Sequence, residues 1–124
     1  MKSEIKELQI NGVCYVEKGT EAAQQEVDDR YCIVRTKDAG VFAGSPPGGA
    51  GDADEEMWLE NARRLWYWKG AASLSQLAME GVKCPEECKF AMPVTEIFLT
   101  GVIEVIPCTA AARKNIASVK EWKS

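Results

Sequence analysis

The side chains best suited to binding chemistry gather in one short stretch, residues 61–74. Three aromatic rings and three cations lie within seven residues there, although the whole chain carries a formal net charge of −4. Aromatic faces can stack on a base, guanidinium groups can grip a phosphate, and a helix N-terminus offers backbone N–H donors. These groups could hold a nucleotide, and nothing beside them is equipped to cleave one.

The chain contains no histidine, the side chain most used for acid–base catalysis near neutral pH. A Ser–His or Cys–His nucleophile pair is therefore impossible within it. Catalysis by carboxylates such as Glu60 or Glu104 stays open, but no spacing singles them out. We therefore expect a binding protein without catalytic residues rather than an enzyme.

Side chains alternate between the two faces of a strand, and this divides the aromatic stretch. Arg64, Trp66 and Trp68 share one face, and the alternate residues, which include Arg63, share the other. One face would belong to the core and the other to a site, and the pattern does not say which. Both arginines and both tryptophans are candidate ligand contacts; the alternative is that the rings pack in the core or at an interface.

Three residues outside this strand are further candidate contacts. Ser73 has Gln76 three residues later, a capping box that predicts a helix start close to the aromatic stretch. Phe42 lies between two glycines, which either leave room for stacking on a ligand or simply make a turn. Arg113 lies early in a predicted helix, where its charge opposes the helix dipole and hints at a nearby anion.

The cysteines and the charge balance limit the other possibilities. The five cysteines are an odd number, and no secretory signal is visible, so we expect a reducing cytoplasm. Cys84 and Cys88 could form half of a metal site, but a structural loop is the preferred interpretation, with no metal and no cofactor. The acidic balance argues against nucleic acid as a partner, and no apolar run is long enough to span a membrane.

The hydrophobic pattern predicts an α+β fold: an antiparallel β-sheet meander with two packed helices in a single small domain. Residues 1–30 are expected to form an N-terminal hairpin or arm, with a turn at Asn11-Gly12. Residues 31–124 are expected to form the ligand-binding domain. Within it, residues 45–56 are rich in proline, glycine and acids, which predicts a mobile insert outside the core.

The expected helices begin at recognisable caps. One follows Ser73 and ends before Gly81, and the other follows Thr109 and continues to about residue 121. Residues 83–92 predict a loop, and Pro107 is expected to end the last strand. Strands are predicted at residues 31–36, 41–44, 63–68, 94–99 and 102–106.

Three segments resemble a known phage family: residues 33–44, 61–77 and 103–109. Ala-Arg-Arg-Leu-Trp-Tyr-Trp at 62–68, followed by Gly-Ala-Ala-Ser-Leu at 70–74, is the specific part. The chain is similar here to the first family of Thoeris anti-defence proteins. The resemblance covers roughly residues 31–124, and the N-terminal arm and the insert carry little of it.

The resemblance implies a phage protein that works in the host bacterial cytoplasm. It would bind and sequester a glycocyclic ADP-ribose isomer made by bacterial TIR-domain sensors, without cleaving it, so that the Thoeris effector stays inactive. It also implies a homo-oligomer built from dimers, and a second site for cyclic oligonucleotides is a further expectation. Two other classes stay open: a nucleotide-signal hydrolase, and a protein-binding inhibitor or virion accessory protein.

Overall fold

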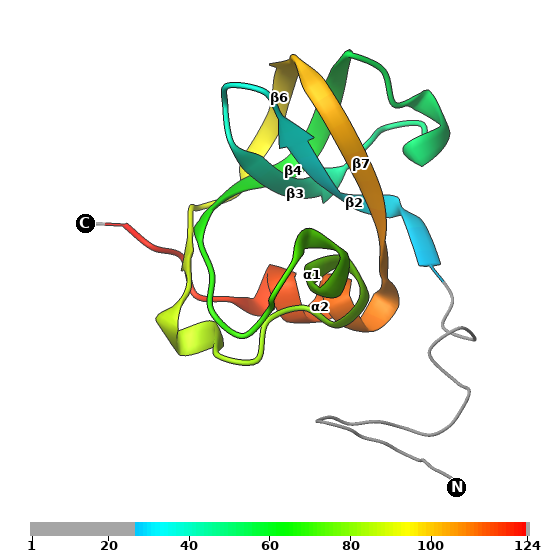
Figure 1. The fold of residues 1–124 in the computed structure, drawn as a ribbon. Helices are drawn as coiled ribbons and strands as arrows, with labels where there is room; N and C mark the ends of the chain where they lie inside the picture. The colour runs from blue at the N-terminus through cyan, green and yellow to red at the C-terminus, as the bar shows by residue number, and fades with distance from the viewer. Residues whose placement is uncertain (1–26, 124) are drawn as a thin grey trace, which may run out of the picture.

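The computed structural model of the protein describes residues 27–123. This part of the chain contains one antiparallel sheet and two α-helices, so the α+β prediction is confirmed (Figure 1). The hairpin predicted at Asn11-Gly12 lies outside the described residues. The elements are β2 (Val27–Thr36), β3 (Val41–Ser45), η2 (Ala50–Asp52), β4 (Glu56–Tyr67), α1 (Leu74–Glu80), η3 (Pro85–Glu87), β5 (Lys89–Phe90), β6 (Val94–Thr100), β7 (Val102–Thr109) and α2 (Ala110–Ser118).

The strands form a meander with a return. β2, β3 and β4 are neighbours in the sheet, each antiparallel to the next. The second edge of β4 pairs with β6 along its first half and with β5 along its second half. β7 then returns to pair with β2 at the far edge. Both helices lie on one side of the sheet (Figure 1).

The first core fills the space between the sheet and the helices. The apolar positions of α2 recur at helical spacing, so Ala112 and Ile116 turn inward, and Val119 follows them into the core. Spacing at helical intervals in the sequence already predicts this buried side, and the structure confirms it. Other members of this core are Tyr31, Ile33, Leu65, Leu77 and Phe90.

The second core lies on the other face of the sheet. Gly101 alone joins β6 to β7, yet these strands pair with β4 and β2, so the sheet has to curl around this face. Ala50 of the insert packs against this core, so the insert contributes to the interior that it was expected to lie outside. The buried members include Val34, Phe42, Leu59 and Leu99.

A β-bulge at Asn61 lies in the middle of β4. At this point β4 holds one residue more than β3, so Asn61 and Ala62 together oppose the single Gly44. Asn61 has a φ of 49°, a conformation that asparagine adopts more readily than most residues. A Cβ atom on Gly44 would lie 2.8 Å from the Leu59 side chain, so the bulge requires glycine opposite it.

The bulge changes which residues of β4 share a face. Before it, Met57 and Leu59 belong to the second core. After it, Ala62 belongs to that core, whereas Leu65 belongs to the core under the helices. The interval between residues on one face is therefore three at the bulge and two elsewhere.

Both helices start where their caps predict. The Ser73 hydroxyl accepts a hydrogen bond from the backbone N–H of Gln76 at 3.1 Å. The Thr109 hydroxyl accepts one from the N–H of Ala112 at 3.0 Å. The same hydroxyl donates to the carbonyl of Met79 at 2.8 Å, which ties the start of α2 to the end of α1.

Several boundaries differ from the sequence prediction. β2 begins at Val27 rather than at residue 31, and β4 begins at Glu56 rather than at residue 63. β7 passes through Pro107 and ends at Thr109, so the expected strand end at the proline is wrong. Because β7 is an edge strand, one of its sides needs no backbone donor. The second helix ends at Ser118, where Arg63 binds the final carbonyls. Residues 83–92 contain η3 and β5 rather than a simple loop.

Candidate functional site

Three of the predicted contacts line one shallow pocket at the end of β4. Arg64, Trp66 and Trp68 form part of its wall, and residues 38–41, in and after the β2–β3 turn, form the rest together with Leu65. The cavity has a volume of about 470 Å³. We call it the aromatic–cationic pocket. Arg64 and Trp66 are exposed whereas Arg63 and Leu65 are buried, which answers the question that strand alternation left open.

Arg64 is held by a ring beneath it. Its guanidinium carbon lies 4.7 Å from the centroid of the Phe42 ring, a cation–π contact. Within residues 27–123 no carboxylate forms an ion pair with Arg64, so its N–H groups are available to an outside anion. Phe42 itself is 2% exposed, so it supports Arg64 rather than offering a face to a ligand.

The two tryptophans of the pocket differ in how they are held. Trp66 is 65% exposed, an unusual position for the largest apolar side chain. Trp68 is half-buried and packs against the core under the helices.

The Asp38 carboxylate is the acidic group of this pocket and could accept hydrogen bonds from sugar hydroxyls.

Arg63 belongs to the scaffold instead. Its side chain is buried, and Nη1 donates to the carbonyls of Ile116 and Val119 at 3.1 and 2.9 Å. Nε donates to Ala91 O at 2.9 Å, and Nη2 donates to Phe90 O at 3.2 Å. Burial lowers the pKa of this guanidinium. Its charge is met by carbonyl dipoles at the end of α2, so we do not retain it as a ligand contact.

Ser73 is a helix cap that lies outside the pocket. Its hydroxyl is occupied by Gln76, and the Gln76 side chain accepts from the N–H of Ala72 at 2.8 Å in return. Ser73 is absent from the residues that line the aromatic–cationic pocket. Its position is therefore accounted for by helix capping.

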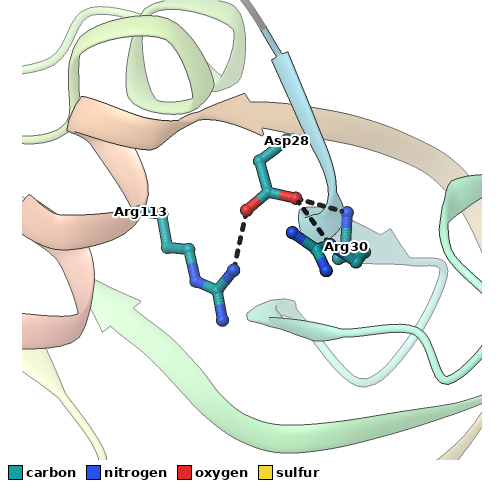
Figure 2. A network of polar contacts seen from close by, with 3 residues as sticks. All are labelled: Asp28, Arg30 and Arg113. Atoms are coloured by element: carbon teal, nitrogen blue, oxygen red, sulfur yellow. Dashed lines mark hydrogen bonds and ion pairs between the residues drawn. The ribbon is translucent and has the colours of Figure 1, made fainter.

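Arg113 lies at a different place, in a network with Asp28 and Arg30. Figure 2 shows the Asp28 carboxylate between the two arginines. Nη1 of Arg113 lies 2.7 Å from one carboxylate oxygen, and the N–H of Arg30 donates to the other at 3.0 Å. The backbone hydrogen bond from Arg30, followed by the bond from Arg113, lowers the pKa of Asp28. The anion that the misplaced charge of Arg113 suggested is thus Asp28.

A second pocket lies beside this network. It has a volume of about 400 Å³ and does not share a residue with the aromatic–cationic pocket. Its charges are mixed, because Glu60 faces the same cavity as the two arginines. It is lined by Arg30, Ser45, Pro46, Pro47, Glu60 and Arg113.

The loop of Cys84 and Cys88 brings possible metal ligands together. The ligand atoms of Cys84, Glu86 and Glu87 lie within 4.8 Å of one another. Glu87 is engaged by Lys69 at 3.0 Å, and burial raises the pKa of the Cys88 thiol. Exposed acids of this kind are common without an ion, so the loop alone assigns no metal.

The sequence reasoning passed over a second aromatic pair. Trp58 and Phe98 lie opposite each other on β4 and β6, with ring centroids 5.1 Å apart and an angle of 50° between the rings. They are 49% and 46% exposed. The alternation of acid and aromatic residues at 56, 58 and 60 was the available signal for this surface.

Comparison with known proteins gives a family. Residues 29–116 match the family described as a domain of unknown function, DUF6948, and the chain belongs to this family. No curated protein and no solved structure matches the chain. The matched segment begins within β2 and ends within α2. It contains every residue that lines the two pockets described above, and all of the sheet except the first two residues of β2. In residues 27–123, no helix is long and apolar enough to cross a membrane.

Proposed function

We propose that this protein binds a small nucleotide messenger in the aromatic–cationic pocket and sequesters it without cleaving it. The observation that carries the proposal is the convergence of Arg64, Trp66 and Trp68 on one cavity. An exposed indole and an arginine that has no carboxylate partner within residues 27–123 suit a ligand that has both a base and a phosphate.

Each side chain has a role in this proposal. Trp66 stacks on the base, an interaction worth about 1–3 kcal/mol per base. Arg64, which the Phe42 ring supports from below, donates to the phosphate oxygens. Asp38 accepts from a ribose hydroxyl across the pocket, and its charge favours sugar over a second phosphate on that side.

The side chains near the pocket support retention without cleavage. The chain has no histidine, and Glu60 lines the other pocket, beside Arg30 and Arg113. Glu104 is paired with Arg35 at 3.0 Å on the surface. Neither of the carboxylates considered as a base is among the residues that line the aromatic–cationic pocket.

The resemblance to the first family of Thoeris anti-defence proteins names a ligand for this proposal. The messenger would be a glycocyclic ADP-ribose isomer from a TIR-domain sensor, and its capture in the host cytoplasm would protect an infecting phage. The acting species would be a homo-oligomer built from dimers. This identification depends on the resemblance, whereas the class of ligand depends on the pocket.

A thermal-shift screen followed by calorimetric titration tests the proposal. We expect stabilisation by cyclic ADP-ribose isomers; a ligand at 100 times its Kd stabilises by about 2.7 kcal/mol. Arg64→Ala and Trp66→Ala should abolish the shift and keep the fold. Arg35→Ala and Trp122→Ala are the matched controls, because they remove an exposed cation and an exposed indole elsewhere.

Recovery of the ligand decides between capture and turnover. After denaturation of the complex, chromatography should return the ligand unchanged and in stoichiometric amount. A new product, in the presence or absence of Mg²⁺ or Mn²⁺, would identify a hydrolase instead. No shift with any nucleotide at millimolar concentration would reject the pocket as a nucleotide site.

A further inference from the structure

The pair of Trp58 and Phe98 forms one wall of a third cavity, of about 340 Å³. The two rings are tilted relative to each other rather than stacked flat, and both line the cavity. Two carboxylates, Asp52 and Glu56, line the same cavity, and no lysine or arginine among residues 27–123 does. The other residues that line it are Pro46, Pro47 and Met57.

More acid lies on the other side of the aromatic pair. Glu60 on β4 and Glu96 on β6 are direct cross-strand partners, two positions from Trp58 and Phe98 in each strand. Both carboxylates are exposed. Like charges directly opposite each other destabilise a sheet, and neither carboxylate forms an ion pair with a described residue. Glu60 also faces the cavity that Arg30 and Arg113 line, so Glu96 is the less compensated of the two. We call Asp52, Glu56, Trp58, Glu60, Glu96 and Phe98 the acid–aromatic strip.

The strip has a fixed spacing. Residues 56–60 of β4 pair with residues 96–100 of β6 without interruption. Side chains on one face of a strand recur about every 7 Å, so the strip alternates acid, aromatic and acid over about 13 Å. Met57 and Leu59, the residues between, are anchored in the second core, which holds the strip's backbone in place.

We propose that the acid–aromatic strip binds an arginine-rich segment of a partner protein. A guanidinium can lie on the indole face of Trp58 by a cation–π contact and can donate two parallel hydrogen bonds to a carboxylate. Alternate side chains of an extended peptide have the same spacing as the strip. Binding would also relieve the repulsion between Glu60 and Glu96.

The chemistry selects against other occupants. A nucleic acid or an acidic peptide is repelled by four carboxylates. Lysine fits less well than arginine, because an ammonium lacks the planar fork that matches a carboxylate and stacks on a ring. The strip shares no lining residue with the aromatic–cationic pocket, so either site can fail without the other.

Fluorescence anisotropy of a labelled hexa-arginine peptide, with the full chain at 150 mM salt, tests the proposal. We expect Trp58→Leu to weaken binding about tenfold and Glu60→Gln with Glu96→Gln to weaken it at least as much. The matched control is Glu86→Gln with Glu87→Gln, which removes the same charge from a distant exposed loop. It should change the affinity less than twofold, and hexa-lysine should bind several-fold more weakly than hexa-arginine.

Either of two results would overturn the proposal. If the control weakens binding as much as the change at Glu60 and Glu96, the attraction is general and has no site. If hexa-arginine does not bind at millimolar concentration, there is no recognition of arginine at all. Thermal melts of every variant separate a lost site from a lost fold, and unchanged nucleotide binding by Trp58→Leu separates this site from the aromatic–cationic pocket.

Discussion

The two ends of β4 present the same kind of residue in opposite electrostatic settings. At the end of the strand, exposed Trp66 lies with Arg64, whose cation is supported by Phe42. Near its beginning, exposed Trp58 lies among carboxylates, with Glu56 in the same cavity. An indole contributes area and a π-face to either surface. Its charged neighbours decide whether an anion or a cation is the better ligand, so the two proposed sites on this strand favour ligands of opposite charge.

The largest expected effect comes from the arginine that neither pocket uses. Arg63→Met should lower the free energy of unfolding by about 3 kcal/mol or more, because several buried carbonyls lose a charged donor at once. Urea unfolding followed by circular dichroism measures it. Arg63→Lys should keep only part of the free energy of unfolding that Arg63→Met loses, since an ammonium cannot replace the planar fork of guanidinium donors. A loss below about 1 kcal/mol would mean that Arg63 is not the link between β4 and α2.

The glycine opposite the bulge comes next. Gly44→Ala should destabilise by about 1–3 kcal/mol, because the new methyl group would meet Leu59 and the backbone of β4. Gly51→Ala is the matched control, since nothing lies within 4 Å of a Cβ there, and we expect a change within about 0.5 kcal/mol. Equal effects at the two positions would contradict the close packing at the bulge.

Exchange of single charges should separate the two pockets. Arg64→Gln is expected to weaken binding of the phosphate ligand about tenfold, which corresponds to a loss of about 1.4 kcal/mol from charge-assisted hydrogen bonds. It should leave the binding of hexa-arginine unchanged. Glu56→Gln should weaken the binding of hexa-arginine and leave the binding of the phosphate ligand unchanged. Calorimetric titrations of both variants with both ligands measure it. A variant that weakens both ligands equally would show that the two ends of β4 are coupled.

The smallest effect concerns pH and lies away from both pockets. The pKa of Asp28 is lowered in the fold, so its contribution to stability is complete above the unfolded value of 3.8 and is lost as pH falls through the lower folded value. We expect Asp28→Asn to melt slightly below the wild type at pH 6. The difference should disappear as the pH falls below 3.8. A constant difference down to pH 2 would argue against ionisation of Asp28 as its cause.

Local patterns in the sequence were sufficient for much of the fold. The caps at Ser73 and Thr109 depend on residues close together in the chain, and the structure has them where they were predicted. The prediction that Arg63 and Arg64 lie on opposite faces was correct. Alternation alone, however, does not show which of the two faces is buried. Only the contact of Arg63 with α2, more than fifty residues away, fixes which of the two is inside.

Other features of the candidate site depend on distant partners and could not be predicted. The ion pair of Arg113 joins residues 85 positions apart. Pro107 has no effect on β7 only because that strand lies at an edge, which depends on the order of the whole sheet. The pairing of Trp58 with Phe98 likewise requires the register of β4 against β6, which no short window contains.

The left-handed conformation of Asn61 limits which residues this position of β4 can accept. If β4 ran straight through this position, Arg63 and Arg64 would exchange faces, and each would leave the contacts that it now makes. A β-branched residue, which resists a φ of 49°, would favour that straight strand. Arg63 and Arg64 are neighbours of the same type and make different contacts, yet both sets of contacts depend on the backbone conformation of a third residue, Asn61.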